Sequence, residues 1–263
     1  MANSTETDDD LLSLDAISLS FGGVAALEDV SFNVRQGEIR AIIGPNGSGK
    51  SSLLNCINGF YQPQSGRITF KGETRSRMKP HAAAKLGIAR TFQNIALFPG
   101  MSTLDNVMTG RNLKMHRNIF WQALHFGPAR KEETEHRAVA EEMIHFLGLE
   151  AVRDTQVGEL PYGLQKRVEL ARALVAEPDL LLLDEPMAGM NREEKEGMCR
   201  TIIDAKEKLG ITIVLIEHDM SVVMDISDRI VVLDHGSKIA DGTPDEVRSN
   251  SDVIDAYLGV KHS

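Results

Sequence analysis

The sequence predicts an α/β fold built on a parallel β-sheet, and two observations carry this prediction. A glycine-rich stretch at residues 44–51 lies between a strand pattern at residues 39–43 and a helix pattern at residues 51–59. Two further runs, at residues 179–183 and 212–216, are almost entirely apolar and are followed by charged residues. Runs that are apolar on both faces are typical of strands buried in a parallel sheet. With 263 residues, the chain is long enough for one large α/β domain that carries an inserted lobe.

The glycine-rich stretch reads G-x-x-x-x-G-K-S, which is the pattern of a phosphate-binding P-loop. We expect its backbone N–H groups to surround phosphate oxygens, and Gly47 to let the loop approach them closely. Lys50 would reach the β- and γ-phosphates, and the Ser51 hydroxyl would bind Mg²⁺. Free N–H groups at the start of the following helix favour the same anion. The alternative is a glycine-rich turn that binds nothing. The expected nucleotide-binding residues here are Gly44, Pro45, Asn46, Gly47, Ser48, Gly49, Lys50, Ser51 and Ser52.

Four polar residues follow predicted strands and should meet at one edge of the sheet. Asp184 and Glu185 end the first apolar run, and His218 follows the second. Gln93 follows a predicted strand at residues 88–92. Because the carboxyl ends of parallel strands share an edge, these groups should lie near the P-loop. We expect Asp184 and Gln93 to serve Mg²⁺, and Glu185 to polarise the attacking water. His218 is a candidate sensor of the γ-phosphate. The alternatives are strand-end charges in solvent and a glutamine that only bonds its own loop.

The remaining elements surround this edge. Apolar alternation at residues 14–20 and 26–34 predicts an antiparallel β-layer. Phe21 lies at the turn between them, either to stack on adenine or to pack in a core. The polar, acidic residues 1–10 predict a disordered tail. The other expected strands lie at residues 67–72, 230–233 and 237–241, and the expected helices at residues 81–86, 101–107, 130–147, 166–175, 192–209, 221–228 and 251–259.

Residues 94 to about 160 differ in character from the rest and predict an inserted helical lobe. The lobe carries Phe120 and Trp121. These two aromatic residues either receive a helix of a membrane partner or form the core of the lobe.

The order of these motifs closely resembles the ATP-binding subunit of an ABC transporter. The resemblance rests on the P-loop, Gln93, the stretch Leu160-Pro161-Tyr162-Gly163-Leu164-Gln165, the run ending at Asp184, and His218, and it extends from about residue 12 to the C-terminus. It implies a P-loop NTPase (RecA-like) core with an antiparallel β subdomain and an inserted α-helical subdomain, within an ATPase domain at residues 11–263. It also implies that residues 160–165 are the signature, that residues 187–191 are the D-loop, and that Phe21 is the adenine-stacking aromatic.

Members of this family work as a head-to-tail pair, so the resemblance implies ATP bound between the P-loop of one subunit and the signature of another, identical or paralogous. Tyr162, Gly163 and Gln165 are then expected to contact the nucleotide. Two residues depart from the family pattern. Pro161 replaces a serine, and the lost hydroxyl could cost about 1.5–3 kcal/mol if nothing substitutes for it. Asn191 stands where many relatives carry aspartate.

Stretches at residues 89–93, 188–191, 216–220 and 253–259 resemble, more narrowly, the ATPases for branched-chain (hydrophobic) amino-acid uptake. This implies membrane-spanning permease subunits, indirect service to a solute-binding protein, and a cytoplasmic position held by the permease at the inner face of the membrane. ATP and Mg²⁺ are the implied cofactors. Related systems for urea, amides or carboxylates, an exporter ATPase, and a soluble ABC-type ATPase without a transport role are the alternatives.

Composition excludes several other classes of protein. The net charge of −9 argues against a general nucleic-acid binder, which needs a basic surface. Cys56 and Cys199 lie far apart, which fits a reduced protein without a disulfide framework. No apolar run reaches the length that spans a bilayer.

Overall fold

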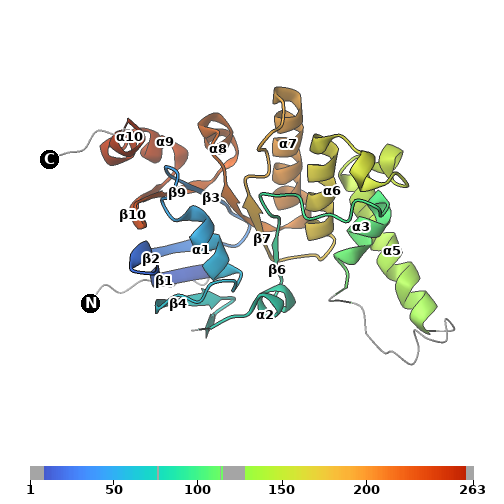
Figure 1. The fold of residues 1–263 in the computed structure, drawn as a ribbon, viewed down its shortest axis with the longest axis horizontal. Coiled ribbons are helices and arrows are strands. Elements are labelled where there is room, and N and C mark those ends of the chain that lie inside the picture. Colours follow the sequence, from blue (N-terminus) through green and yellow to red (C-terminus); the bar gives the residue numbers. More distant parts are fainter. Residues whose placement is uncertain (1–8, 76, 113, 115–127, 259–263) are drawn as a thin grey trace.

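The computed structural model of the protein describes residues 9–75, 77–112, 114 and 128–258 (Figure 1). Within these residues the larger sheet has six strands, in the order β10-β9-β3-β8-β7-β6. Five of them run parallel, and β10 runs antiparallel to β9. The strands are β3 (Ile39–Ile43), β6 (Ile88–Arg90), β7 (Leu180–Asp184), β8 (Thr212–Ile216), β9 (Arg229–Asp234) and β10 (Ser237–Gly242). Every residue of β3, β7 and β8 is buried, as their apolar runs predict.

The predicted antiparallel layer is present as a second sheet, with the order β2-β1-β4-β5 among the described strands. Its strands are β1 (Asp10–Phe21), β2 (Val24–Arg35), β4 (Ser65–Phe70) and β5 (Glu73–Arg75). The apolar side chains of helix α1 (Lys50–Ile57) share one buried cluster with both sheets, so this helix is held between them. That position fixes the P-loop, which ends at the first turn of α1.

The expected disordered tail is wrong at its last two residues. Asp10 begins β1, and the Asp9 carbonyl accepts a hydrogen bond from the Gln36 amide at 3.0 Å. Residues 1–8 lie outside the described part of the chain.

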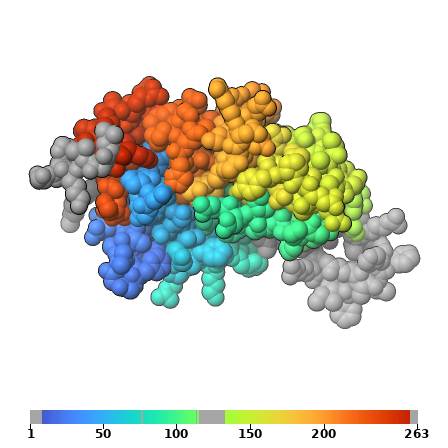
Figure 2. Space-filling view, turned by 45° about the horizontal axis from the view of Figure 1, so that its top comes forward, coloured from blue at the N-terminus to red at the C-terminus, as the bar shows by residue number. Residues whose placement is uncertain are grey.

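The inserted lobe contains α3 (Thr103–Thr109), α5 (Pro128–Phe146) and two 3₁₀ turns, Glu150–Val152 and Val157–Glu159. It leads into α6 (Tyr162–Leu174). The Ser102 hydroxyl caps α3 by accepting a hydrogen bond from the Asp105 amide at 3.1 Å. Figure 2 shows α5 at one end of the molecule and the C-terminal helices at the other. Phe120 and Trp121 lie outside the described residues, so their expected role stays a prediction.

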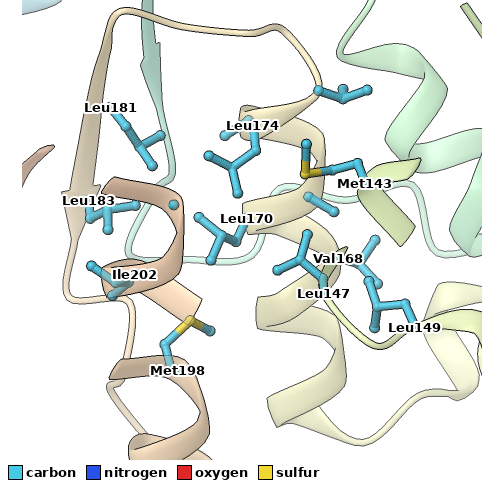
Figure 3. Close-up of a cluster of buried hydrophobic side chains, with 14 of the residues drawn as sticks. Met143, Leu147, Leu149, Val168, Leu170, Leu174, Leu181, Leu183, Met198 and Ile202 are labelled. Atoms are coloured by element: carbon cyan, nitrogen blue, oxygen red, sulfur yellow. The ribbon is translucent and has the colours of Figure 1, made fainter. Parts of the chain in front are cut away.

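The described residues of the lobe share their buried cluster with the sheet. Side chains from α5, α6, α7 (Arg192–Leu209) and the sheet meet in one buried cluster (Figure 3). In Figure 3, Leu181 and Leu183 of the sheet face Leu170 and Leu174 of α6. Met143 of α5 packs on the same cluster. The signature helix α6 is therefore connected to the sheet through continuous apolar packing.

The remaining helices complete the layers around the sheet: α2 (Pro80–Lys85), α8 (Met220–Ile226), α9 (Pro244–Arg248) and α10 (Ser251–Leu258). No helix of the described residues combines the length and the hydropathy that crossing a membrane requires.

One predicted strand ends early. Strand β6 stops at Arg90 and not at Phe92, so Gln93 lies in an irregular segment. The Thr91 amide still bonds to Leu182 of β7, at 3.0 Å. The backbone groups of Phe92 turn instead to side chains of α6, which ends the ladder.

Candidate functional site

The P-loop has the backbone conformation that its glycines predict. Gly44, Gly47 and Gly49 have φ angles of 147°, 82° and 101°, which favour a residue without Cβ. A Cβ on Gly44 would clash with the Leu233 carbonyl, and one on Gly49 with the Ala26 carbonyl. A Cβ on Gly47 would meet only open space, so this position faces outward. The loop is thus pressed against the protein at both ends and open in its middle.

The Lys50 ammonium lies over the loop and is buried. It donates hydrogen bonds to the carbonyls of Gly44, at 2.8 Å, and Pro45, at 2.9 Å. Burial lowers the pKa of Lys50, while the nearby Glu185 and Asp184 carboxylates act in the opposite direction. The ammonium therefore lies between the loop and the acidic edge of the sheet, where an anionic ligand would meet it.

Two buried oxygens at this place lack a hydrogen-bond partner within the described residues. They are Oγ of Ser48 in the P-loop and Oδ1 of Asp184 at the end of β7. Buried polar atoms are normally paired, so both atoms fit a site that a ligand completes. The described residues hold no group of three His, Cys, Asp or Glu side chains suited to a metal. A single free carboxylate oxygen such as Asp184 Oδ1 fits Mg²⁺, which is held by one or two protein groups together with phosphate oxygens and water.

Glu185 is the meeting point of the predicted catalytic groups. Its Oε1 lies 2.6 Å from His218 Nε2, and its Oε2 accepts a hydrogen bond from Gln93 Nε2 at 2.9 Å. Its backbone is held at a φ of 50°, an unfavourable conformation for a residue with a side chain. The Glu185 amide donates to the Ile216 carbonyl of β8 at 2.9 Å, which fixes this conformation. The structure thus brings Glu185, His218 and Gln93 together at the sheet edge that the sequence predicts.

Glu217 is a member of this cluster that the sequence reading did not assign. It is buried, and its carboxylate accepts hydrogen bonds from the amides of Met187, at 2.8 Å, and His218, at 3.2 Å. Burial raises the pKa of Glu217, and these amide donors act against that shift. Glu217 joins the D-loop to the segment that carries His218. An acidic residue directly after a fully apolar strand was the available signal.

The residues expected to form the signature lie at the start of α6. Pro161 is the N-cap residue, and no side chain caps this end of the helix. The Tyr162 ring is 44% exposed and lies against Gly189 of the D-loop. Gly163 is buried, and a Cβ there would clash with the Glu194 carboxylate of α7. Gln165 Nε2 donates to the Leu160 carbonyl at 2.8 Å. These contacts are made with Leu160, with Glu194 of α7 and with Gly189 of the D-loop, and the expected nucleotide contacts of Tyr162, Gly163 and Gln165 stay predictions.

Helix α6 also holds the segment that carries Gln93. Lys166 Nζ donates to the Gln93 carbonyl at 2.9 Å, and Arg172 Nη1 to the Ala96 carbonyl at 2.6 Å. Glu169 Oε1 accepts a longer hydrogen bond from the Phe92 amide at 3.4 Å. Burial raises the pKa of Glu169, and the Lys166 ammonium opposes that shift. Spacings of three residues along α6 place all three side chains on one helix face.

Phe21, the predicted adenine-stacking residue, lies at the end of the hairpin. Phe21 is 46% exposed at the hairpin end of β1, and its ring meets the Tyr61 ring edge-on, with centroids 5.0 Å apart. An exposed aromatic face is available there for stacking.

Asn191 caps α7, because its side chain accepts a hydrogen bond from the Glu194 amide at 3.0 Å, while the Glu194 carboxylate accepts one from the Asn191 amide. Asparagine and aspartate are both preferred cap residues, so this departure keeps the helix cap and removes only the charge.

A phosphate-binding loop beside an acidic sheet edge, on a parallel sheet with an antiparallel layer, defines a P-loop nucleotide hydrolase. Residues 27–188 match the family described as "ABC transporter". Residues 237–263 match a second description, "Branched-chain amino acid ATP-binding cassette transporter". The chain belongs to the ABC transporter family, and it is an ATP-binding, ATP-hydrolysing subunit of that family.

The curated relatives agree over nearly the whole chain. The branched-chain amino acid transport ATP-binding protein BraF of Pseudomonas aeruginosa is 39% identical over 250 residues, which cover 95% of this chain and 98% of that protein. The corresponding LivG protein of Salmonella typhimurium is 39% identical over 249 residues, with the same coverage of 95% and 98%.

Solved structures agree with the fold. An ATP-binding cassette of an ABC transporter in its ADP conformation gives a TM-score of 0.83 at 33% identity, covering 95% of this chain and 99% of that one. The dimeric post-hydrolysis state of another cassette, bound to ADP and Pi, gives a TM-score of 0.74 at 26% identity, covering 89% and 98%.

Proposed function

We propose that this subunit powers the uptake of branched-chain amino acids by hydrolysing ATP between two ATP-binding subunits at the inner face of the cell membrane. The observation that carries the proposal is the convergence of Gln93 and His218 on Glu185, beside Lys50. The solute is inferred from the printed names of BraF and LivG and from the match of residues 237–263.

The proposed chemical roles are supported by this geometry. Lys50 and the P-loop amides bind the phosphates, and Ser51, Asp184 and Gln93 hold Mg²⁺ with them. The ion supplies charge neutralisation at the phosphoryl group. Glu185 orients and polarises the attacking water, since its carboxylate is held in place by Gln93 and His218. His218 holds the correct orientation of Glu185 and meets the γ-phosphate. Phe21 stacks on the adenine.

The second half of the site comes from another subunit. The start of α6 has no side-chain cap, so its N–H groups are available to an anion. The contacts described for Tyr162, Gly163 and Gln165 are made with Gly189, Glu194 and Leu160, and not with the P-loop of the same chain. A dimeric cassette with ADP and Pi is among the similar structures. We therefore propose a head-to-tail pair with a second copy or a paralogue.

A mixing experiment tests this pairing. Lys50→Ala damages the P-loop half, and Gly163→Asp places a negative charge at the signature half. In a head-to-tail pair, a mixed dimer has one site with both faults and one site with none. We expect each variant alone to lose ATPase activity and their mixture to regain part of it. Failure of the mixture to regain activity would reject a pair of identical copies.

The permease is proposed to dock in a groove beside the Gln93 segment. A cavity of about 340 Å³ lies between β6, α3 and α6. It is lined by Ala89, Arg90, Phe98, Thr109, Gly110, Asn112, Arg172, Ala173 and Ala176. Phe98 is 52% exposed at its rim, which supplies an apolar contact for a partner helix. Cross-linking from residue 98 to the permease, in the isolated complex, tests this docking. The docking proposal would be contradicted if the permease were cross-linked only from other positions of the ATPase and not from residue 98.

Transport itself is tested in proteoliposomes that contain the complete complex with its solute-binding protein. ATP supplied on the side of this subunit should drive leucine accumulation, and the Glu185→Gln complex should not. Transport of urea or an amide, but not of leucine, would show that the complex takes up a different class of solute. ATP-driven movement away from the solute-binding protein would identify an exporter.

A further inference from the structure

Arg90, the last residue of β6, has a buried guanidinium that none of the roles above uses. Its side chain is 8% exposed, and Nη2 lies 2.8 Å from Asp184 Oδ2. Nη1 donates to Asn55 Oδ1 of α1 at 2.6 Å. The guanidinium also lies over the Phe92 ring, 5.2 Å from its centroid, next to the Gln93 segment. Arg90 thus contacts β7, α1 and the segment that leads to Gln93.

These contacts leave Asp184 with one free oxygen in a defined direction. Oδ2 is occupied by Arg90, whereas Oδ1 is buried without a hydrogen-bond partner in the described residues. The side chain of Asp184 is only 6% exposed, so solvent does not satisfy Oδ1. A carboxylate that is fixed through one oxygen presents the other in a constant orientation. Partners of this kind commonly set the geometry of metal ligands.

The link to α1 adds a second constraint. Ser51, the other predicted Mg²⁺ residue at this edge, lies in the first turn of α1, one turn before Asn55. Because Arg90 bonds to both Asn55 and Asp184, it fixes the distance between α1 and the end of β7. A planar guanidinium holds two acceptors in a fixed geometry, whereas the donors of a lysine ammonium rotate around a single atom.

We propose that Arg90 is a positioning residue for magnesium: it occupies Oδ2 of Asp184, so that Oδ1 is left for the ion, and it ties Asp184 to the helix that carries Ser51. This inference rests on the magnesium site of the proposed function. A plain structural ion pair is the competing account, since buried pairs often only avoid leaving a charge unpaired. The two accounts differ in their effect on metal binding.

The experiment measures Mn²⁺ binding to the ADP complex by electron paramagnetic resonance, with ADP affinity measured separately without metal. Arg90→Met removes both contacts and should weaken Mn²⁺ binding by about tenfold or more, as loss of an orienting partner does. Arg90→Lys keeps the charge but loses the fork, and it should weaken Mn²⁺ binding by a smaller factor. Metal-free ADP affinity should stay unchanged in both variants.

Arg40→Met is the matched control. Arg40 is a buried arginine on strand β3 of the same sheet, with Nε 2.7 Å from Glu38 and Nη1 2.6 Å from Asp241. It lies toward the start of the parallel strands, away from the P-loop edge. The substitution should lower stability as much as Arg90→Met while leaving Mn²⁺ binding unchanged.

Each outcome decides the matter. Unchanged or tighter Mn²⁺ binding in Arg90→Met would overturn the inference, because removal of charge would then outweigh loss of orientation. If Arg90→Met does not fold, Arg90→Lys and Asn55→Leu carry the test, and normal Mn²⁺ binding in both overturns the inference. Absence of Mn²⁺ binding by the wild-type ADP complex would instead refute the magnesium site of the proposed function.

Discussion

The P-loop edge of the sheet and the start of α6 are the two proposed half-sites of this chain, each completed by a partner subunit, and they are built in opposite ways. At the sheet edge, Glu185 is held from two sides by hydrogen bonds, and Lys50 bonds to its own loop. At the start of α6, no side chain caps the helix, and Tyr162 is 44% exposed. The first half is preorganised within the chain, whereas the second presents unpaired groups to solvent.

This difference indicates where each half gains its function. A group that must act on the bound phosphate needs a fixed position before the ligand arrives. A helix start that must receive the phosphate of another subunit needs free N–H groups and an accessible surface. Changes at the sheet edge should therefore alter nucleotide binding in any assembly state. Changes at the α6 start should alter nucleotide binding only in the assembled pair.

The largest expected effect tests the sheet edge. Glu185→Gln removes the charge that polarises water but keeps the shape of the side chain. We expect kcat for ATP hydrolysis to fall by about 10²- to 10⁴-fold, the usual contribution of a general base, while ATP affinity is retained. Steady-state ATPase assays and equilibrium nucleotide binding measure both quantities. The control is Glu196→Gln, on an exposed glutamate of α7. Near-normal turnover in Glu185→Gln would reject this residue as the base.

The next effect concerns nucleotide binding to a single chain. Lys50→Ala removes an ammonium placed for the phosphates, and a hydrogen bond to a charged group contributes about 1.5–3 kcal/mol. We therefore expect the Kd for ATP to rise by about 10- to 150-fold, since every 1.4 kcal/mol is tenfold. Titration of the isolated subunit with a fluorescent ATP analogue measures this change. The contrast between the two halves would fail if Lys50→Ala lost affinity only in the assembled complex.

The sequence predicts the local features of the site better than the contacts between residues that are distant along the chain. The strands β3, β7 and β8 follow from apolar runs, and Gly44–Ser51 from glycine spacing, because both signals are local. Arg90, Glu217 and Lys166 were not assigned, since their partners lie far along the chain and come together only in the fold. The end of β6 was misplaced because side chains of α6 take over the backbone groups of Phe92.

A moderate effect tests the α6 half. Pro161→Ser adds a hydroxyl at the uncapped N-cap position, and a serine there stabilises a helix by about 1 kcal/mol. In the proposed head-to-tail pair, the hydroxyl would also reach the partner's phosphate. The helix N–H groups already supply part of this binding, so we expect about a 3- to 10-fold gain in apparent ATP affinity, from a net 0.5–1.5 kcal/mol. The isolated subunit should show the stability gain alone. Unchanged affinity and turnover in the complex would show that the hydroxyl is irrelevant there.

The smallest expected effect concerns the contacts that hold the sheet edge within the chain. Asp219 follows His218, and its carboxylate lies 2.8 Å from Lys195 Nζ of α7. Hydrogen bonds from Lys195 and Ser221 lower the pKa of Asp219 to about 2. Because the folded-state pKa lies below the unfolded value, this stabilisation is complete above about pH 4 and is lost as the pH falls toward 2.

Asp219→Asn should therefore reduce the free energy of unfolding by about 1 kcal/mol at pH 7, a value discounted because the pair is one-third exposed. Urea unfolding at pH 7, 5 and 3 measures the difference between variant and wild type. The difference should be the same at pH 7 and 5 and smaller at pH 3, because protonation then removes the wild-type ion pair as well. Lys208→Met, which breaks an exposed pair with Asp204 within α7, is the control and should change stability less. A difference independent of pH would mean that Asp219 acts through packing and not through its charge.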